Sequence, residues 1–285
     1  MYIYLNGKVI SKNDAMISPY DHGFMYGLGA FETFRTYNGF PFLIEEHLKR
    51  LHEALNELNI NLKLDSDAVI QMVSTLLNKN KMNDAYFRLN VSAGVGDIGL
   101  QTDPYVEPVV ILYTKPLVET SFISEKELVL LKTKRNTPEG EKRLKSHHYL
   151  NSILGKRELS NMNQEGIFLT REDYISEGTV SNLFWYKDNM LFTPHTSTGI
   201  LEGITRKWVM HASKRLNIPL ETGNYTIETL TEADEVFLTN SIQELVPVSH
   251  FQDTTFSGAE GEVYQKFREL YMRHTKKQCK SIDIF

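Results

Sequence analysis

The spacing of hydrophobic residues changes along the first 116 residues. Apolar and polar residues alternate in several short stretches, and the pairs Asn6-Gly7 and Asn38-Gly39 are typical of tight turns between strands. From Ile44 onward, apolar residues recur every three or four positions, which indicates amphipathic helices. The pattern predicts strands at 2–5, 31–37, 40–43, 85–93 and 109–113, and helices over 44–58 and 69–77.

The rest of the chain continues the mixture of the two periods. It predicts strands at 128–132, 166–170, 182–187, 190–193, 235–239 and 246–251, and helices over 149–162, 204–216 and 261–276. Hairpin turns such as Asp188-Asn189 favour a mixed sheet over a doubly wound parallel one, so we expect an α+β fold. Periodicity is weak from 116 to 125. We therefore expect an N-terminal α+β domain (1–118), a linker (119–125) and a larger C-terminal domain (126–285).

Composition excludes several classes of protein. The chain has 285 residues, 41% of them hydrophobic, and a net charge of −5. This is enough apolar material for a folded core, and a mildly acidic chain is a poor non-specific ligand for nucleic acid. Cys279 is the single cysteine, which excludes an intramolecular disulfide. Because no secretion signal or membrane-length apolar run occurs, we expect a cytoplasmic protein that binds neither nucleic acid nor membrane.

Most chemically interesting residues have ordinary interpretations when each is taken alone. Lys145 lies in a basic stretch that would normally be solvated, and Arg50 could be a surface charge on the first helix. Glu177 lies between Ser176 and Gly178, most simply in an exposed turn. The neighbouring pair His147-His148 lacks the spacing of a metal site, so we expect no metal.

Two backbone patterns are more suggestive. Residues 199–206 form a loop that opens a helix, and the free N–H groups at a helix start favour an anion. Thr239, Asn240 and Ser241 end a strand with three small polar side chains, a frequent ligand position. Structural capping remains the alternative interpretation at both places.

Taken together and in order, the motifs resemble those of the fold-type IV pyridoxal-phosphate enzymes, a family that contains branched-chain and D-amino-acid aminotransferases and 4-amino-4-deoxychorismate lyases. The resemblance spans nearly the whole chain. The matching segments lie at 21–27, 30–33, 47–51, 144–146, 177–184, 193–194, 201–206, 236–240 and 247–248. It implies a D-amino-acid-aminotransferase-like fold with a smaller N-terminal domain and a larger C-terminal one, pyridoxal 5'-phosphate in the cleft between them, and a homodimer.

The resemblance also implies roles for individual residues. Lys145 would form the Schiff base with the cofactor aldehyde, for which the amine must be deprotonated. Glu177 would stand against the pyridine nitrogen, where a carboxylate favours the protonated ring. The other implied cofactor contacts are Arg50, Tyr149, Gly203, Ile204, Thr205, Asn240, Ser241 and Ile242. Arg50, the backbone of Ile204 and Thr205, and the Ser241 hydroxyl would hold the phosphate, whereas Tyr149 would meet the ring hydroxyl.

Substrate contacts are less well defined by the resemblance. The family often has Arg where this chain has His22, and Asn where it has His148. The implied substrate residues are Phe31, Thr33, Arg88, His148 and Asn240. Arg88 is a candidate for a substrate carboxylate, and a strand-surface charge is an equal alternative.

Three features favour the lyases within the family. Asn240-Ser241 stands where aminotransferases usually carry Gly-Thr, and an asparagine amide can donate to a substrate carboxylate. Segments 136–140 and 143–151 resemble lyases of Gram-positive bacteria, and 31–35 fits the same group. We therefore expect a lyase that forms 4-aminobenzoate and pyruvate for folate biosynthesis. A branched-chain or D-amino-acid aminotransferase and a non-catalytic scaffold that binds the cofactor are the alternatives.

Overall fold

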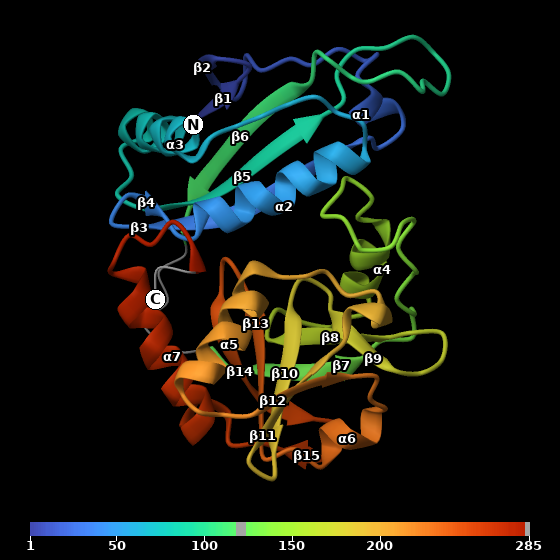
Figure 1. Ribbon diagram of the computed structural model, residues 1–285, viewed down its shortest axis with the longest axis vertical. Coiled ribbons are helices and arrows are strands. Elements are labelled where there is room, and N and C mark those ends of the chain that lie inside the picture. The colour runs from blue at the N-terminus through green and yellow to red at the C-terminus, as the bar shows by residue number, and fades with distance from the viewer. Residues whose placement is uncertain (118–123, 283–285) are drawn as a thin grey trace. The chain divides into compact units, whose positions relative to one another are not determined.

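The computed structural model describes residues 1–117 and 124–282, which form two compact units (Figure 1). Within the described residues, the first unit comprises 1–117, 144–148 and 274–282, and the second comprises 124–143 and 149–273. The segment that carries Lys145 thus packs with the first unit, although the sequence division assigned it to the C-terminal domain. Most of the predicted linker 119–125 lies outside the described residues, and the domain boundaries stay a prediction.

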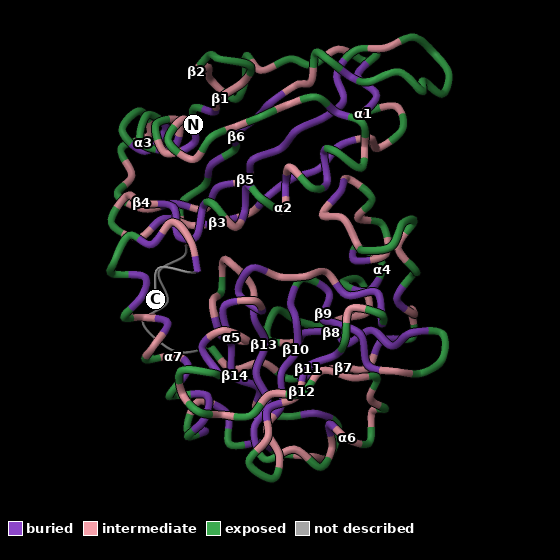
Figure 2. Tube along the Cα trace, in the orientation of Figure 1, coloured by how far each residue is buried: buried purple, intermediate pink, exposed green. Residues whose placement is uncertain are grey.

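The first unit is built on a six-stranded antiparallel sheet with the order β2-β1-β6-β5-β3-β4. Its central strand β5 is largely buried, as Figure 2 shows. The strands are β1 (Tyr2–Leu5), β2 (Lys8–Ser11), β3 (Gly29–Tyr37), β4 (Phe40–Pro41), β5 (Ala85–Ser92) and β6 (Val109–Pro116).

Two long helices, α2 (Ile44–Glu57) and α3 (Ser66–Asn80), cover one face of this sheet, and a short helix, α1 (His22–Met25), precedes β3. The apolar stripe of each long helix enters one core with alternate strand residues such as Phe34. Because strand side chains alternate, Glu32 points to the same helix-covered face, whereas Phe31 points to the opposite one.

Two distant segments complete the first unit. The stretch 144–148 runs along β3, where the Phe31 N–H donates to the Lys145 carbonyl over 2.9 Å and Ala30 forms a bridge with Ser146. The C-terminal stretch supplies hydrogen-bond acceptors to the start of α2, where no side chain caps the helix. There the carbonyls of Cys279 and Lys280 accept the N–H groups of Leu43 and Glu45.

The second unit contains a nine-stranded mixed sheet with the order β12-β11-β10-β13-β14-β7-β8-β9, and β15 pairs with β14. Three pairs are parallel, β11–β12, β14–β7 and β7–β8, and the others are antiparallel. The predicted α+β class with a mixed sheet is confirmed. The strands are β7 (Lys126–Leu130), β8 (Gln164–Leu169), β9 (Ile175–Gly178), β10 (Asn182–Lys187), β11 (Met190–Pro194), β12 (Leu220–Gly223), β13 (Glu235–Asn240), β14 (Glu244–Phe251) and β15 (Thr254–Thr255).

Helices α5 (Ile204–Arg215) and α7 (Glu262–Thr275) pack beside β13 in this unit. Phe237 of β13 stacks on Phe184 of β10 at 5.3 Å and contacts Phe267 of α7 at 5.8 Å. Asn182 pairs with Thr239 across the same two strands, so both side chains lie on this helix-covered face. The remaining helical segments are α4 (Leu150–Arg157), α6 (Ile227–Thr231) and two short 3-10 turns at 196–198 and 258–260.

The predicted helix over 149–162 was too long, because α4 ends at Arg157. Beyond it, the Asn161 side chain accepts the Asn163 N–H, and the Gln164 side chain accepts the Ser160 N–H. Such local bonds compete with helical hydrogen bonding and close a turn instead. Six short elements were not predicted: α1, α6, β2, β9, β12 and β15.

Candidate active site

Lys145 lies beside the ring of Phe31 in the first unit. Its Nζ is 4.7 Å from the ring centroid, and the Arg88 guanidinium is 3.5 Å from the same centroid. A phenylalanine face attracts cations, so one buried ring contacts both the predicted Schiff-base lysine and a predicted substrate arginine. The structure thereby brings together three of the predicted residues.

Arg88 belongs to a polar cluster on the face of the sheet that α2 and α3 do not cover. Asn90 Oδ1 accepts from Arg88 Nη2 at 3.3 Å and from His147 Nε2 at 3.0 Å. Burial, reinforced by the charge of Arg88, lowers the pKa of His147 to about 4. His147 is therefore neutral near pH 7, and Arg88 supplies the positive charge of this cluster. Thr33 pairs with Arg88 on the neighbouring strand, which places its side chain on the same face.

His148 lies apart from this cluster. Its side chain is exposed, and its Nε2 is 3.4 Å from the carbonyl oxygen of Tyr26, in the loop after α1. The position supports contact with the loop more directly than contact with a substrate.

Arg50 is fixed by a buried carboxylate that the sequence analysis did not single out. Its Nε and Nη2 donate to the two oxygens of Glu32, each over 2.7 Å, and His47 Nδ1 donates to the same Glu32 carboxylate over 2.7 Å. Burial alone would raise the pKa of Glu32, but the charge of Arg50 and the bonds from both partners lower it to about 2. Glu32 therefore stays ionised and orients the guanidinium. The three-residue spacing of His47 and Arg50 on α2 was the available sequence signal.

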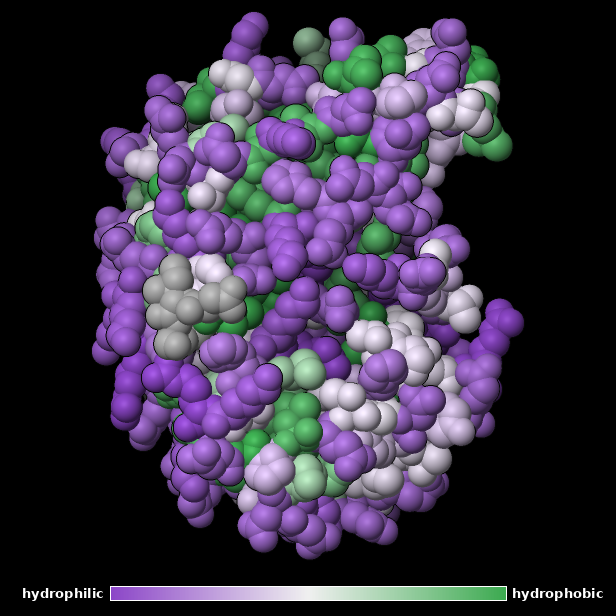
Figure 3. Space-filling view, viewed as in Figure 1, coloured by the Kyte–Doolittle hydropathy of each residue, from purple (hydrophilic) through white to green (hydrophobic). Residues whose placement is uncertain are grey.

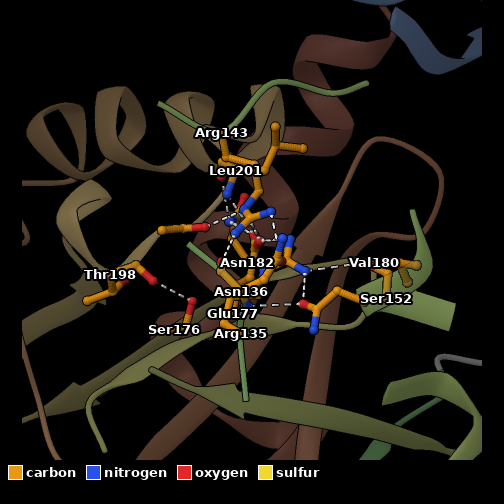
Figure 4. A network of polar contacts seen from close by, with 12 residues as sticks. Arg135, Asn136, Arg143, Ser152, Ser176, Glu177, Val180, Asn182, Thr198 and Leu201 are labelled. Carbon is orange, nitrogen blue, oxygen red and sulfur yellow. Dashed lines mark hydrogen bonds and ion pairs between the residues drawn. The ribbon is translucent and has the colours of Figure 1, made fainter. Parts of the chain in front are cut away.

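Glu177 is buried at the end of β9, in a ring of donors (Figure 4). Its Oε1 accepts from Arg135 Nη2 at 2.6 Å, and its Oε2 accepts from Asn182 Nδ2 at 3.1 Å and from the Leu201 N–H at 3.0 Å. Arg143 Nε stands 3.9 Å from Oε1. The exposed-turn interpretation of Glu177 is therefore wrong, and its partners Arg135, Arg143 and Asn182 were not predicted.

The turn after Glu177 is held by a second buried carboxylate. Glu165 Oε1 accepts from Thr179 Oγ1 at 2.9 Å, from the Val180 N–H at 3.1 Å and from Ser181 Oγ at 3.0 Å. This network fixes the chain between β9 and β10, and with it the position of Glu177.

Helix α5 begins at a tightly packed glycine. Gly203 is its N-cap residue and offers no side-chain cap, so the N–H groups of Ile204 and Thr205 lie in the first turn without intrahelical partners. A Cβ at position 203 would lie 2.1 Å from Asn182 Oδ1, which only glycine avoids. Asn182 also donates to the Leu201 carbonyl at 2.8 Å, so one side chain ties this loop to Glu177.

The turn between β13 and β14 carries the remaining predicted cofactor residues. Asn240 Oδ1 accepts the N–H groups of Ile242 at 3.0 Å and Gln243 at 2.7 Å, and its Nδ2 donates to Gln243 Oε1 at 3.0 Å. Asn240 therefore closes this turn and presents Ser241. One residue earlier, Thr239 Oγ1 is buried without a hydrogen-bond partner among the described residues.

Tyr149 immediately precedes α4 as its N-cap residue and is half-buried.

Within 1–117 and 124–282, no group of three or more His, Cys, Asp or Glu side chains could hold a metal ion. No helix in that part of the chain is both long enough and apolar enough to cross a membrane.

Comparisons with known proteins identify relatives over almost the full length. The chain is 42% identical to the aminodeoxychorismate lyase of Bacillus subtilis over 277 residues, which cover 96% of this chain and 94% of the relative. Its structure matches the branched-chain amino acid aminotransferase of Escherichia coli with a TM-score of 0.82 at 29% identity, covering 95% of this chain and 93% of that one.

A second structural match carries a cofactor derivative. A T.th. branched-chain amino acid aminotransferase, complexed with N-(5'-phosphopyridoxyl)-L-glutamate, superposes with a TM-score of 0.87 at 25% identity, covering 99% of this chain and 96% of that one. The family profile for amino-transferase class IV matches residues 29–251. The predicted fold-type IV relationship and its pyridoxal-phosphate dependence are thus confirmed for the family, and this chain belongs to the class IV aminotransferase family.

Proposed function

We propose that this protein is a pyridoxal-phosphate-dependent 4-amino-4-deoxychorismate lyase, which forms 4-aminobenzoate and pyruvate for folate biosynthesis. The observation that carries the proposal is the 42% identity to an aminodeoxychorismate lyase over 96% of the chain. At that coverage, the candidate lysine, the candidate carboxylate and the turn at Asn240 all lie inside the matched region.

The residues present suit pyridoxal phosphate. The start of α5 offers two backbone N–H groups and the Thr205 hydroxyl to an anion, as a phosphate requires. The buried Thr239 hydroxyl lacks a partner among the described residues and can turn to a bound group. Glu177 provides an ordered carboxylate for a protonated ring nitrogen. We propose that Gly203, Ile204, Thr205, Asn240, Ser241 and Ile242, with Arg50 and Tyr149, hold the cofactor.

When bound, pyridoxal phosphate supplies an aldehyde that bonds to amines and a ring that accepts an electron pair. Lys145 Nζ is the group of this chain that would hold the cofactor by its aldehyde when no substrate is present. When it is not bonded to the cofactor, the same Nζ would accept the proton from the substrate ring carbon that bears the amine. The carbon–oxygen bond to the enolpyruvyl group breaks, the ring becomes aromatic, and enolpyruvate gains a proton at its methylene carbon to become pyruvate.

Arg88 is the proposed contact for a carboxylate of the substrate, which carries two. Its guanidinium lies on the uncovered sheet face with Phe31 and Thr33, and the neutral His147 adds no competing charge. Asn240 and His148 remain proposed substrate residues on the strength of the family resemblance.

An aminotransferase is the alternative, since the structure superposes on branched-chain enzymes with a TM-score of 0.87. A product assay separates the two. Protein loaded with pyridoxal phosphate should release 4-aminobenzoate from aminodeoxychorismate. Rapid amino transfer from an amino acid to 2-oxoglutarate without aminobenzoate would establish the aminotransferase. Cofactor binding without turnover of either kind would establish a non-catalytic scaffold, which the ordered surroundings of Glu177 and Arg50 disfavour.

A second copy of this chain is the proposed partner. Exposed apolar side chains gather around α1 and the loop between β5 and β6, and Figure 3 shows hydrophobic atoms over that loop. The two segments are joined, since the Gly96 N–H donates to Tyr20 O and the Gly99 N–H to Tyr26 Oη. The most exposed members are Met16, Phe24, Val95, Ile98, Leu100 and Val106.

Sedimentation tests the homodimer. The native protein should sediment as a dimer, and Ile98→Asp with Leu100→Asp should shift it toward the monomer; a monomeric native protein would refute this assembly. We also propose a cytoplasmic location, which cell fractionation checks.

A further inference from the structure

Arg135 has an unusual environment for a buried cation. It is 8% exposed, and its Nη2 donates to Glu177 Oε1 at 2.6 Å. Arg135 Nε has no hydrogen-bond partner among the described residues. A buried donor left unsatisfied costs free energy, so the side chain is held here at a cost that its other contacts offset.

Those other contacts restrict how the guanidinium can lie. Nη1 donates to Asn151 Oδ1 at 2.8 Å and approaches Ser152 Oγ at 3.4 Å, both at the start of α4. The guanidinium also lies 5.1 Å from the centroid of the Phe168 ring. With one end held by α4 and its plane against an aromatic ring, Arg135 presents Nη2 to Glu177 in one orientation (Figure 4).

Arg143 also lies near Glu177, but its contacts differ from those of Arg135. Its Nε donates to the Gly199 carbonyl, its Nη2 to the Asn136 carbonyl and its Nη1 to Asn136 Oδ1 at 3.2 Å, so its hydrogen bonds go to the loops at Asn136 and Gly199. It stands 3.9 Å from Glu177 Oε1 as a charge and makes no short bond to that carboxylate. Arg135 is therefore the cation that orients the carboxylate directly.

We propose that Arg135 is a positioning residue, which fixes the orientation of the buried Glu177 carboxylate as an acceptor for the ring nitrogen of the cofactor. This inference rests on the cofactor part of the proposed function. Without Arg135, Oε1 would lose its short charge-assisted bond, and the carboxylate would keep only the two neutral donors on Oε2. It would then be free to rotate, and a misoriented carboxylate attracts a protonated ring less strongly.

A double-mutant cycle on pyridoxal phosphate affinity tests this, with Arg135→Met, Glu177→Gln and their combination. If Arg135 acts through Glu177, Arg135→Met should raise the dissociation constant about tenfold in the native background and less than about twofold beside Glu177→Gln. A merely structural role predicts the same loss in both backgrounds. Arg171→Met, a substitution at an exposed arginine of the same unit, is the matched control and should leave the affinity unchanged.

Arg135→Lys guards against a variant that fails to fold. This variant keeps the positive charge but loses the planar guanidinium. Its affinity for pyridoxal phosphate should therefore lie between those of Arg135→Met and the native protein, and the visible absorbance of the bound cofactor should return. Equal losses in the two backgrounds, or native affinity in folded Arg135→Met, would overturn the inference. The lyase proposal fails separately, if the native loaded protein binds the cofactor yet forms no aminobenzoate. A native protein that binds no pyridoxal phosphate would overturn the inference as well.

Discussion

Glu32 and Arg50 are joined by two parallel hydrogen bonds, Nε to Oε1 and Nη2 to Oε2, each of 2.7 Å. Glu32 lies on β3 and Arg50 on α2, so the pair links the sheet to the helix that covers it. Glu32 is 1% exposed, and its charge is balanced by this arginine and by the bond from His47. The orientation of the Arg50 guanidinium therefore depends on a carboxylate that is buried in the core.

Glu32→Gln should therefore destabilise the protein at neutral pH. The pKa of Glu32 falls from 4.5 to about 2 on folding, so its contribution is fully present above pH 4.5 and is lost as pH falls toward 2. From that gap we expect a contribution of about 3 kcal/mol. Urea unfolding at pH 7 and pH 3 measures it: the native protein should lose more stability than the variant on acidification. Parallel pH profiles would contradict the assignment.

Lys145→Ala should abolish the visible absorbance of bound pyridoxal phosphate and all turnover, because no other group then bonds to the cofactor aldehyde. Absorbance after cofactor loading and gel filtration provides the measurement. Lys142→Ala is the matched control, since Lys142 lies in the same basic stretch and is exposed. Retained absorbance in Lys145→Ala would remove Lys145 from its proposed role.

Asn240 offers a substitution that separates its two roles. Asn240→Asp keeps the oxygen that closes the turn with Ile242 and Gln243 but removes the amide donor. If that donor serves the substrate, Asn240→Asp should slow aminobenzoate formation about tenfold or more, since a lost bond to a charged group costs about 1.5–3 kcal/mol. Cofactor affinity, measured in parallel, separates the loss of a substrate contact from a weaker hold on the cofactor.

Asn240→Gly removes both the turn oxygen and the donor, and restores the glycine usual in the aminotransferases. It should selectively reduce aminobenzoate formation, relative to any slow amino transfer. Steady-state assays of both reactions measure the ratio, and an unchanged ratio would show that Asn240 serves the turn alone.

Arg88→Lys should raise the Michaelis constant for aminodeoxychorismate about tenfold, because lysine replaces a planar fork by a point charge. The stacking on Phe31 and the bond to Asn90 both depend on that fork. The exposed Lys115, on the neighbouring strand β6, provides the control Lys115→Met. A normal Michaelis constant in Arg88→Lys would favour the surface-charge interpretation of Arg88.

The local pattern of the chain was sufficient for the long elements. The apolar stripe from Ile44 onward predicted α2 to within a residue, because it repeats one period for several turns. The apolar segments at β5 and β10 were also predicted as strands. Short strands such as β9 and β12 escaped, because four residues carry too little periodicity. The helix before β8 was predicted too long, because the apolar pattern does not reveal the side-chain hydrogen bonds of Asn161 and Gln164 that form a turn there.

For the candidate site, the sequence by itself determined which residue types stand in the order of the class IV family: Lys145, Glu177, Arg50 and the start of α5. Only the tertiary structure decided what holds them. The pairing of Arg135 with Glu177 spans 42 residues, and that of Arg50 with Glu32 joins a helix to a strand. Such pairs follow no periodicity along the chain; they form because a buried charge requires an opposite charge within hydrogen-bonding reach, whichever element supplies it.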